Sequence, residues 1–156
     1  MKLDRIDCKI LEILQQEGDI SNLDLAKRVA LSASPCARRV KQLSDAGVIS
    51  GYVALLDAKK LGLDLQVILQ VGLSTHRAES MRAFEDAVCA MPEVIECHLI
   101  TGQSADYMLK VMVTDMQAYH QFLLQQLTPI DCVGNVQSSF VLKSVKAQTL
   151  LPVRAT

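Results

Sequence analysis

The sequence predicts an α+β protein that combines an N-terminal winged helix-turn-helix with a C-terminal ferredoxin-like βαββαβ domain. Three observations predict this fold. Apolar residues in the first third recur at helical spacing in three short stretches, and a β-rich stretch follows them. The remaining residues repeat a strand-helix-strand pattern twice. Hydrophobic residues make up 50% of the 156 positions and charged residues 21%, so the chain is expected to bury a core.

The first two expected helices are short. Asp4 can cap the first one, and Gly18 stands where a left-handed residue would end it. Ser21 and Asp24 match a capping box at the start of the second helix. The apolar residues that recur at helical spacing in these two helices are Ile6, Ile10, Ile13, Leu14, Leu25, Ala26 and Val29.

The third helix is expected to begin at Ser34, which can cap it, with Pro35 at the first helical position. Gly47 lies beyond its expected end. Its outward faces carry Arg38, Arg39, Lys41 and Gln42. Residues 25–44 contain five basic side chains and no acid, which suits contact with phosphate. The basic residues before this helix are Lys27 and Arg28.

A helix that turns Arg, Gln and Ser outward beside a tight turn can read the major groove of DNA. The same charges would also suit a solvated face on a small helical bundle. The order of the elements favours the first interpretation, because Val48–Leu56, interrupted by Gly51, is β-rich and follows the helices as a wing does. The sequence therefore favours a DNA-binding module.

Asp57–Gly62 is polar and ends in glycine, so it is the expected boundary between the two parts. Alternating apolar residues beyond it predict strands over 66–73, 94–101, 106–113 and 136–143. The two helices expected between the strands cover Met81–Met91 and Met116–Leu127. Pro92 and Pro129 would end these helices, and Asp115 would cap the second.

A βαββαβ sheet carries helices on one face only. The residues expected on the helix-covered face are Val67, Leu69, Val71, Ile95, Cys97, Leu99, Leu109 and Val111. Those expected on the opposite face are Ile68, Gln70, Gly72, His98, Ile100, Met108, Lys110 and Met112. The opposite face is too apolar to be left in water, so a second sheet from an identical subunit is expected to cover it.

Catalytic and metal chemistry are not expected. The five cysteines form no C-x-x-C pair, and the adjacent residues Cys97 and His98 would point to opposite faces of a strand. His76 and His120 have no partner at ligand spacing, and no activated serine, paired catalytic carboxylates or glycine-rich phosphate loop stand out. Without a signal peptide or an apolar run of about 20 residues, a cytoplasmic location is expected.

These residues resemble those of the leucine-responsive and asparagine-responsive (Lrp/AsnC, feast/famine) regulators over essentially the whole chain. The motifs that carry the resemblance are Leu3–Asp7, Leu31–Cys36, Arg39-Val40, Gly47–Ile49, Gly51-Tyr52, Glu96–His98, Thr101-Gly102, Asp106–Lys110, Thr114–Met116 and Ser138–Lys143. The resemblance implies a transcription regulator of amino-acid metabolism that acts on double-stranded DNA at the nucleoid. The expected DNA-binding residues are Lys27, Arg28, Ser32, Ser34, Pro35, Arg38, Arg39, Lys41 and Gln42.

The resemblance also implies a division into a DNA-binding domain over 1–50, a linker strand and hinge over 51–62, and an effector-binding and oligomerisation domain over 63–156. The strands of a dimer would also pair with the linker strand near Gly51–Leu56, and dimers would assemble into tetramers or octamers. No cofactor is implied, and the implied effector is an amino acid.

The loop from Thr101 to Tyr107 is the expected effector site, because a zwitterion needs hydrogen-bond donors for its carboxylate and an acceptor for its ammonium. The residues expected there are Thr101, Gly102, Gln103, Ser104, Asp106 and Tyr107, with Ser138 close by on the last strand. Three residues separate Gly102 from Asp106, whereas the family pattern has two. The alternative is an ordinary connection in which Gly102 has a positive φ and Asp106 caps the turn.

The residues alone also allow a different function. An oligomeric metabolite-binding protein could use its helical front end to contact a protein partner, because ferredoxin-like domains host many functions.

Overall fold

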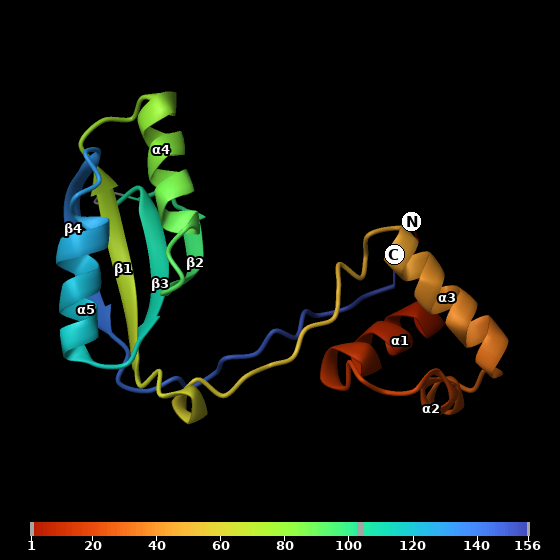
Figure 1. Cartoon of the computed structure of the whole chain (residues 1–156). Helices are drawn as coiled ribbons and strands as arrows, with labels where there is room; N and C mark the ends of the chain where they lie inside the picture. Colours follow the sequence, from red (N-terminus) through yellow and green to blue (C-terminus); the bar gives the residue numbers. More distant parts are fainter. Residues whose placement is uncertain (1, 103–104, 156) are drawn as a thin grey trace. The chain divides into compact units, whose positions relative to one another are not determined.

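The structure, a computed structural model, describes residues 2–102 and 105–155 and divides into two compact units. One unit contains the chain up to Leu55 together with the tail from Lys146, and the other contains Leu56–Val145 (Figure 1). The sequence placed this tail with the second part. The structure groups it with the helical unit, because Val153 packs against the core of that unit.

The helical unit contains α1 (Arg5–Gln16), α2 (Asn22–Arg28) and α3 (Ala33–Asp45). The expected cap of α1 is confirmed: the Asp4 carboxylate accepts from the Asp7 N–H at 2.8 Å, and the Asp7 carboxylate accepts from the Asp4 N–H at 3.1 Å. Ser21 caps α2 as expected, but the Asp24 carboxylate accepts from the Ser21 hydroxyl instead of completing the expected capping box. The core residues of this unit that are at most 2% exposed are Ile10, Leu25, Ala26, Cys36 and Leu43.

Two expected helix ends are wrong. Gly18 does not have the left-handed φ that was expected, because α1 ends with the Glu17 N–H bonded to the Ile13 carbonyl. Helix α3 begins at Ala33 with Ser32 as its N-cap, not at Ser34. Pro35 therefore lies third in the helix, a position that it tolerates because the first four N–H groups of a helix have no intrahelical acceptor.

The turn between α2 and α3 depends on Ala30, which has a φ of 56°. Its N–H donates to the Lys27 carbonyl, and the Leu31 N–H donates to the Ala26 carbonyl at 2.9 Å. These two bonds form a Schellman motif, which reverses the chain directly after α2. Gly47, with a φ of 71°, ends α3 in the same way.

The expected wing is not a strand in this chain. Residues 48–57 are described, and none of them is in a strand. A strand needs a partner for its ladder of hydrogen bonds, and none of the residues described supplies one. The exposed large apolar residues of this segment are Val48, Tyr52, Val53, Leu55 and Leu56.

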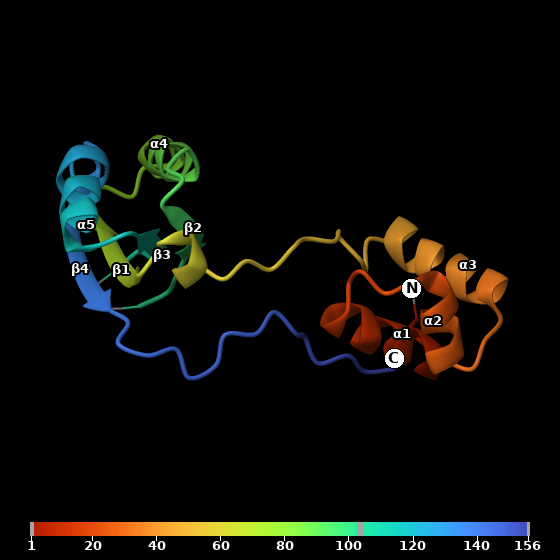
Figure 2. The same cartoon turned by 60° about the horizontal axis from the view of Figure 1, so that its bottom comes forward.

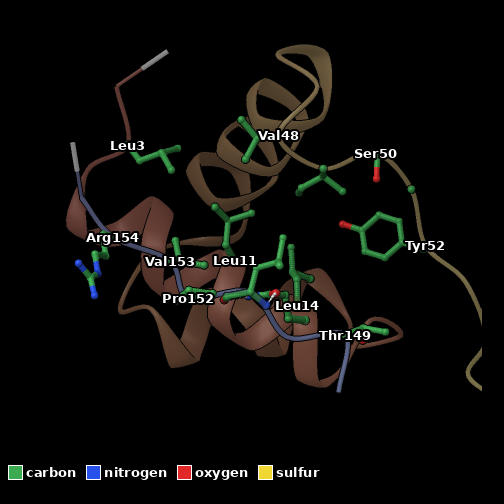
Figure 3. A pocket seen from close by; sticks show the side chains of 14 residues that line it. Leu3, Leu11, Leu14, Val48, Ser50, Tyr52, Thr149, Pro152, Val153 and Arg154 are labelled. Carbon is green, nitrogen blue, oxygen red and sulfur yellow. Dashed lines mark hydrogen bonds between the residues drawn. The ribbon is translucent and has the colours of Figure 1, made fainter. Parts of the chain in front are cut away.

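The helical unit also holds an apolar cavity of about 630 Å³ beside α1. Figure 3 shows the tail running along α1, with Pro152 and Val153 close to Leu11 and Leu14. Tyr52, in the segment after α3, lines the cavity from another side.

The second unit has the predicted βαββαβ order. Its elements are β1 (Leu65–Leu73), α4 (Ala78–Cys89), β2 (Val94–Leu99), β3 (Tyr107–Val113), α5 (Met116–Phe122), a π-helical turn (Leu123–Leu127) and β4 (Val133–Phe140). The sheet is antiparallel in the order β2-β3-β1-β4, and both helices cover the same face (Figure 2). Asp115 caps α5 as expected, because its carboxylate accepts from the Ala118 N–H.

The helix-covered face is buried where it was expected to be, except at two residues of β2. Val67, Leu69, Val71, Leu109 and Val111 have no exposed surface. Ile95 and Leu99 were expected in this core, but they are 52% and 60% exposed.

The exposure of Ile95 is caused by the register of β2. The pairing with β3 shifts between Val94 and Glu96, which makes Ile95 the extra residue of a β-bulge. β2 is also an edge strand, so Leu99 is covered from one side only.

The opposite face of the sheet is less buried than the helix-covered face. Ile68, Met108 and Met112 are half-buried, whereas Gln70 and His98 are exposed. None of the described helices is long and apolar enough to cross a lipid bilayer.

Candidate DNA-binding surface and effector cavity

Helix α3 presents a row of polar side chains with free hydrogen-bonding groups. Ser34, Arg38 and Gln42 are exposed and follow one another at intervals of four residues, so they lie on one face of the helix. Among the described residues none bonds to these three side chains. Donors and acceptors of this kind are available to a nucleic acid without the loss of any internal contact.

The other basic side chains of the surface are engaged in ion pairs. Arg28 binds Glu17 through two hydrogen bonds of 2.6 and 2.8 Å. Lys27 lies 3.0 Å from Asp24, and Lys41 lies 3.4 Å from Asp45. These pairs are exposed, so solvent screens them and a phosphate can compete for each cation.

Arg39 has a structural contact that the sequence did not reveal. Its guanidinium lies 2.7 Å from both the Asp4 and the Asp7 carboxylates, and the Asp7 side chain is only 7% exposed. These bonds raise the pKa of Arg39, and the Asp7 N–H followed by Arg39 lowers the pKa of Asp4. Arg39 therefore ties α3 to the capping box of α1. These bonds hold α3, the helix that also carries Arg38, in place against α1.

The two remaining residues of the expected DNA-binding set lie at the start of α3. Ser32 is exposed at the N-cap and its side chain makes no capping hydrogen bond, while Pro35 is half-buried. The first N–H groups of a helix have no intrahelical acceptor, so this turn can bind an anion.

A cavity of about 710 Å³ lies where the end of β1 meets the segment before β3 and the start of β4. Gly102 and Asp106 line it, as the sequence predicted. Gln103 and Ser104 lie outside the described residues. Thr101 is exposed and does not line the cavity.

The structure does not bring the last two predicted effector residues to this cavity. Tyr107 is buried in the core, where its hydroxyl donates to Glu85 at 2.7 Å, and burial together with this carboxylate raises its pKa. Ser138 pairs with Leu69, a residue of the helix-covered face, and its hydroxyl bonds to that of Tyr119.

Asp106 joins two segments at the cavity. Its carboxylate accepts from the Leu73 N–H at 2.7 Å and from His76 Nε2 at 2.8 Å. The Leu73 bond, followed by that of His76, lowers the pKa of Asp106. Asp106 thus binds the end of β1 and the loop that follows it instead of capping its own turn.

The sequence missed two polar residues of the cavity, His76 and Asn135. The Asn135 side chain accepts from the Gly72 N–H at 3.0 Å, which keeps its NH₂ group available. Gly134 allows this close approach, because a Cβ there would lie 3.1 Å from the Ser74 nitrogen. His76 lies in the loop after β1 and Asn135 lies in β4, and no spacing along the sequence signals their meeting.

Fold and site together define a class: DNA-binding regulators that carry a separate ligand-binding domain. Residues 3–50 match the family model of winged helix-turn-helix DNA-binding domains, and residues 66–151 match that of Lrp/AsnC ligand-binding domains. The chain belongs to the Lrp/AsnC family and is a transcription regulator.

Similarity to individual members extends over nearly the whole chain. The Bkd operon transcriptional regulator of Pseudomonas aeruginosa is 41% identical over 152 residues, which cover 97% of this chain and 99% of that protein. The leucine-responsive regulatory protein of Escherichia coli K12 is 40% identical over 152 residues, 97% of this chain and 92% of that protein. A transcriptional regulator of Neisseria meningitidis, solved as a complex with L-methionine, has a TM-score of 0.93 and 43% identity, with 96% of both chains covered. The family and fold expected from the sequence are confirmed.

Proposed function

We propose that α3 reads operator DNA through Ser34, Arg38 and Gln42. The observation that carries this proposal is that all three side chains are exposed in one row and unpaired among the described residues. Arginine can bind a guanine edge through two hydrogen bonds, and glutamine can do the same with adenine. Side chains that are already free lose no internal bond when they bind bases.

The remaining basic residues contact the DNA backbone. Lys27, Arg28 and Lys41 can each exchange a carboxylate for a phosphate, while Ser32 and the first turn of α3 offer a hydroxyl and N–H groups. Arg39 and Pro35 support α3 from its inner side. Backbone contacts of this kind give affinity that depends on salt concentration but carries no sequence information.

We further propose that an amino acid binds the cavity beside Gly102 and Asp106. The relative of N. meningitidis that was solved with L-methionine supports this ligand class. The Asp106 carboxylate supplies negative charge for an ammonium group, and His76 and Asn135 add polar groups that can bind a carboxylate. A ligand changes DNA affinity only if it binds two states of the regulator unequally.

The two proposed sites assign a role to each part of the chain. Residues 1–50 contact DNA, 51–62 form a hinge whose linker strand pairs only in a dimer, and 63–156 bind the effector and pair subunits, with the tail from Lys146 returning to the helical unit. A dimer that assembles further would present two copies of α3 to the duplex, and the chain would act at the nucleoid.

One pair of measurements tests the proposal. Operator sites are selected from a random DNA pool with the full chain, and affinity is measured by fluorescence anisotropy across a salt series with and without each amino acid. We expect affinity to fall steeply with salt, as counterion release requires, and one or more amino acids to shift it. If the helical front end bound a protein partner instead, no DNA sequence would be enriched.

A further inference from the structure

A second polar cavity in the α+β unit lies at the opposite end of the sheet from the effector cavity. Its volume is about 260 Å³, and it lies at the end of β3 beside α5. Leu65, at the start of β1, pairs with Val113 at this end, whereas Val71 pairs with Tyr107 next to Asp106 at the other. Six strand intervals separate the two ends, or about 20 Å.

The polar lining of this cavity is one carboxylate surrounded by neutral groups. Glu93 supplies the carboxylate, and Thr114, Gln121, Gln125 and Gln126 supply hydroxyl and amide groups. No Lys, Arg or His is among the described residues that line it. Nothing in the lining therefore neutralises the charge of Glu93.

Half of the Glu93 carboxylate is also without a hydrogen bond. Gln126 Nε2 donates to Oε1 at 3.1 Å, whereas Oε2 is buried and has no partner in the part of the chain that is described. A buried carboxylate oxygen that is left unbonded is costly, so native structures supply a partner. Rotation about the last side-chain bond of a Glu costs little energy. A small rotation therefore lets Gln126 bond one carboxylate oxygen while a ligand bonds the other.

The surroundings hold Glu93 in place. Its carbonyl accepts from the Met112 N–H at 2.9 Å, directly before β2 begins. Gln126 lies in the π-helical turn Leu123–Leu127, where the Thr128 N–H donates to the Leu123 carbonyl at 2.9 Å. Such turns are often retained at functional sites because they re-aim side chains at a cost in helix stability.

We propose that this cavity binds a small organic cation that carries a primary ammonium group. The ammonium has three N–H donors, which match the Glu93 carboxylate and the side-chain oxygens of Gln121 and Gln125. Leu63, Val113 and Phe122 give the cavity an apolar wall for a short hydrocarbon chain. The space equals that of about nine water molecules, which suits a ligand of a few non-hydrogen atoms.

Two other ligand classes fit less well. A free amino acid would bring its own carboxylate beside Glu93, with no cationic side chain to receive it. A divalent metal ion needs several anionic or imidazole ligands, and the described residues contain no group of three or more His, Cys, Asp or Glu that could hold one.

The test uses the full chain with n-butylammonium chloride as the probe, at constant ionic strength. Binding is followed by ¹H–¹⁵N NMR, and the side-chain NH₂ signals of Gln125 and Gln126 report on the cavity itself. We expect saturable shifts in the wild type and a loss of affinity of about tenfold or more in Glu93→Gln, because one charge-assisted contact is removed. Glu93→Gln keeps the shape of the side chain and its contact with Gln126.

The matched control is Glu79→Gln, which removes an exposed carboxylate from the first turn of α4. This variant should bind n-butylammonium as the wild type does, and neutral n-butanol should produce no saturable shift at the glutamine signals. The proposal is overturned if Glu93→Gln binds as well as the wild type, or if the wild type shows no saturable shift because a second copy of the chain covers the cavity.

Discussion

Gln15 forms two hydrogen bonds with the backbone of Leu151, a residue 136 positions later in the chain. Its Nε2 donates to the Leu151 carbonyl at 3.1 Å, and its Oε1 accepts from the Leu151 N–H at 2.6 Å. One side chain thus supplies the donor and the acceptor that a neighbouring strand would supply. The tail around Leu151 and Val153 is held on the helical unit by this contact and by the packing of Val153 (Figure 3).

Removing this contact should release the tail. In Gln15→Ala we expect the Leu151 amide to exchange with solvent about tenfold faster and the helical unit to lose about 1 kcal/mol of stability, as for a lost pair of exposed hydrogen bonds. Hydrogen exchange measured by NMR and urea unfolding give the two values. Gln16→Ala is the control, because Gln16 is exposed on the same helix and makes no such contact. Equal exchange in both variants would show that the tail is held by apolar contacts alone.

Arg38 should contribute to sequence selection. We expect Arg38→Ala to weaken operator binding by about 1–3 kcal/mol and to relax the preference at one base pair. Arg28→Ala should instead weaken all sequences alike and reduce the salt slope by about one. Arg82→Ala, on α4, removes the same charge from an exposed site of the other unit and should leave binding unchanged. Unaltered affinity and selectivity in Arg38→Ala would reject this face of α3 as the reading face.

Arg39 should matter for stability more than for base selection. Arg39→Met leaves the buried Asp7 carboxylate without its cation, so we expect a loss of about 1–3 kcal/mol in urea unfolding at neutral pH. Lys41→Met is the control, because its ion pair with Asp45 is exposed. If both substitutions had the same small effect, the Arg39 contact would not hold the helices together.

The ion pair of Arg39 with Asp4 predicts how the stability of the protein depends on pH in acid. The folded-state pKa of Asp4 lies below the ordinary value of 3.8, so its stabilising contribution is complete above that value and is lost as pH falls through the folded pKa. We expect wild-type stability to fall in this window below about pH 4. The fall should be smaller in Arg39→Met but not absent, because the Asp7 N–H bond to Asp4 remains. Unfolding curves at pH 2, 3, 4 and 6 measure the difference; identical curves would contradict it.

Ala30 should be a site of backbone strain. A residue with a side chain is disfavoured at its φ of 56°, whereas glycine is not, so Ala30→Gly should raise the free energy of unfolding by up to about 1 kcal/mol. Ala46→Gly is the matched control at the end of α3, where the φ is −80°. That change should lower stability, because only the unfolded chain gains freedom. A destabilised Ala30→Gly would mean that the turn has no strain to relieve.

The open face of the sheet should pair two subunits. Met112 is half-buried on that face, and Met112→Asp would place a carboxylate in the proposed interface, so we expect dissociation or unfolding in sedimentation experiments. Met116→Asp is the control, because Met116 is 55% exposed at the N-terminus of α5, where negative charge is favourable. A folded wild-type monomer at micromolar concentration would refute the dimer.

Local patterns were sufficient for much of the fold. The Asp4 and Asp115 caps, the three helices, the βαββαβ order and most of the buried face follow from the period of apolar residues and from capping chemistry. Such signals depend on residues within one or two turns of each other, so a single sequence contains them in full. The exposed row of Arg38 and Gln42 was predictable for the same reason.

What only the tertiary structure decided depends on contacts between distant segments. The bulge at Ile95 depends on the register between β2 and β3. The ion pair of Arg39 with Asp7 joins two helices through residues that are 32 positions apart. The polar residues of the effector cavity, Asp106, His76 and Asn135, come from three segments that meet at one end of the sheet. The sequence alone determined which elements form, because propensity and period are local. Packing decided which side chains remain free to bind, because a charge or an amide is available only when no distant residue has already taken it.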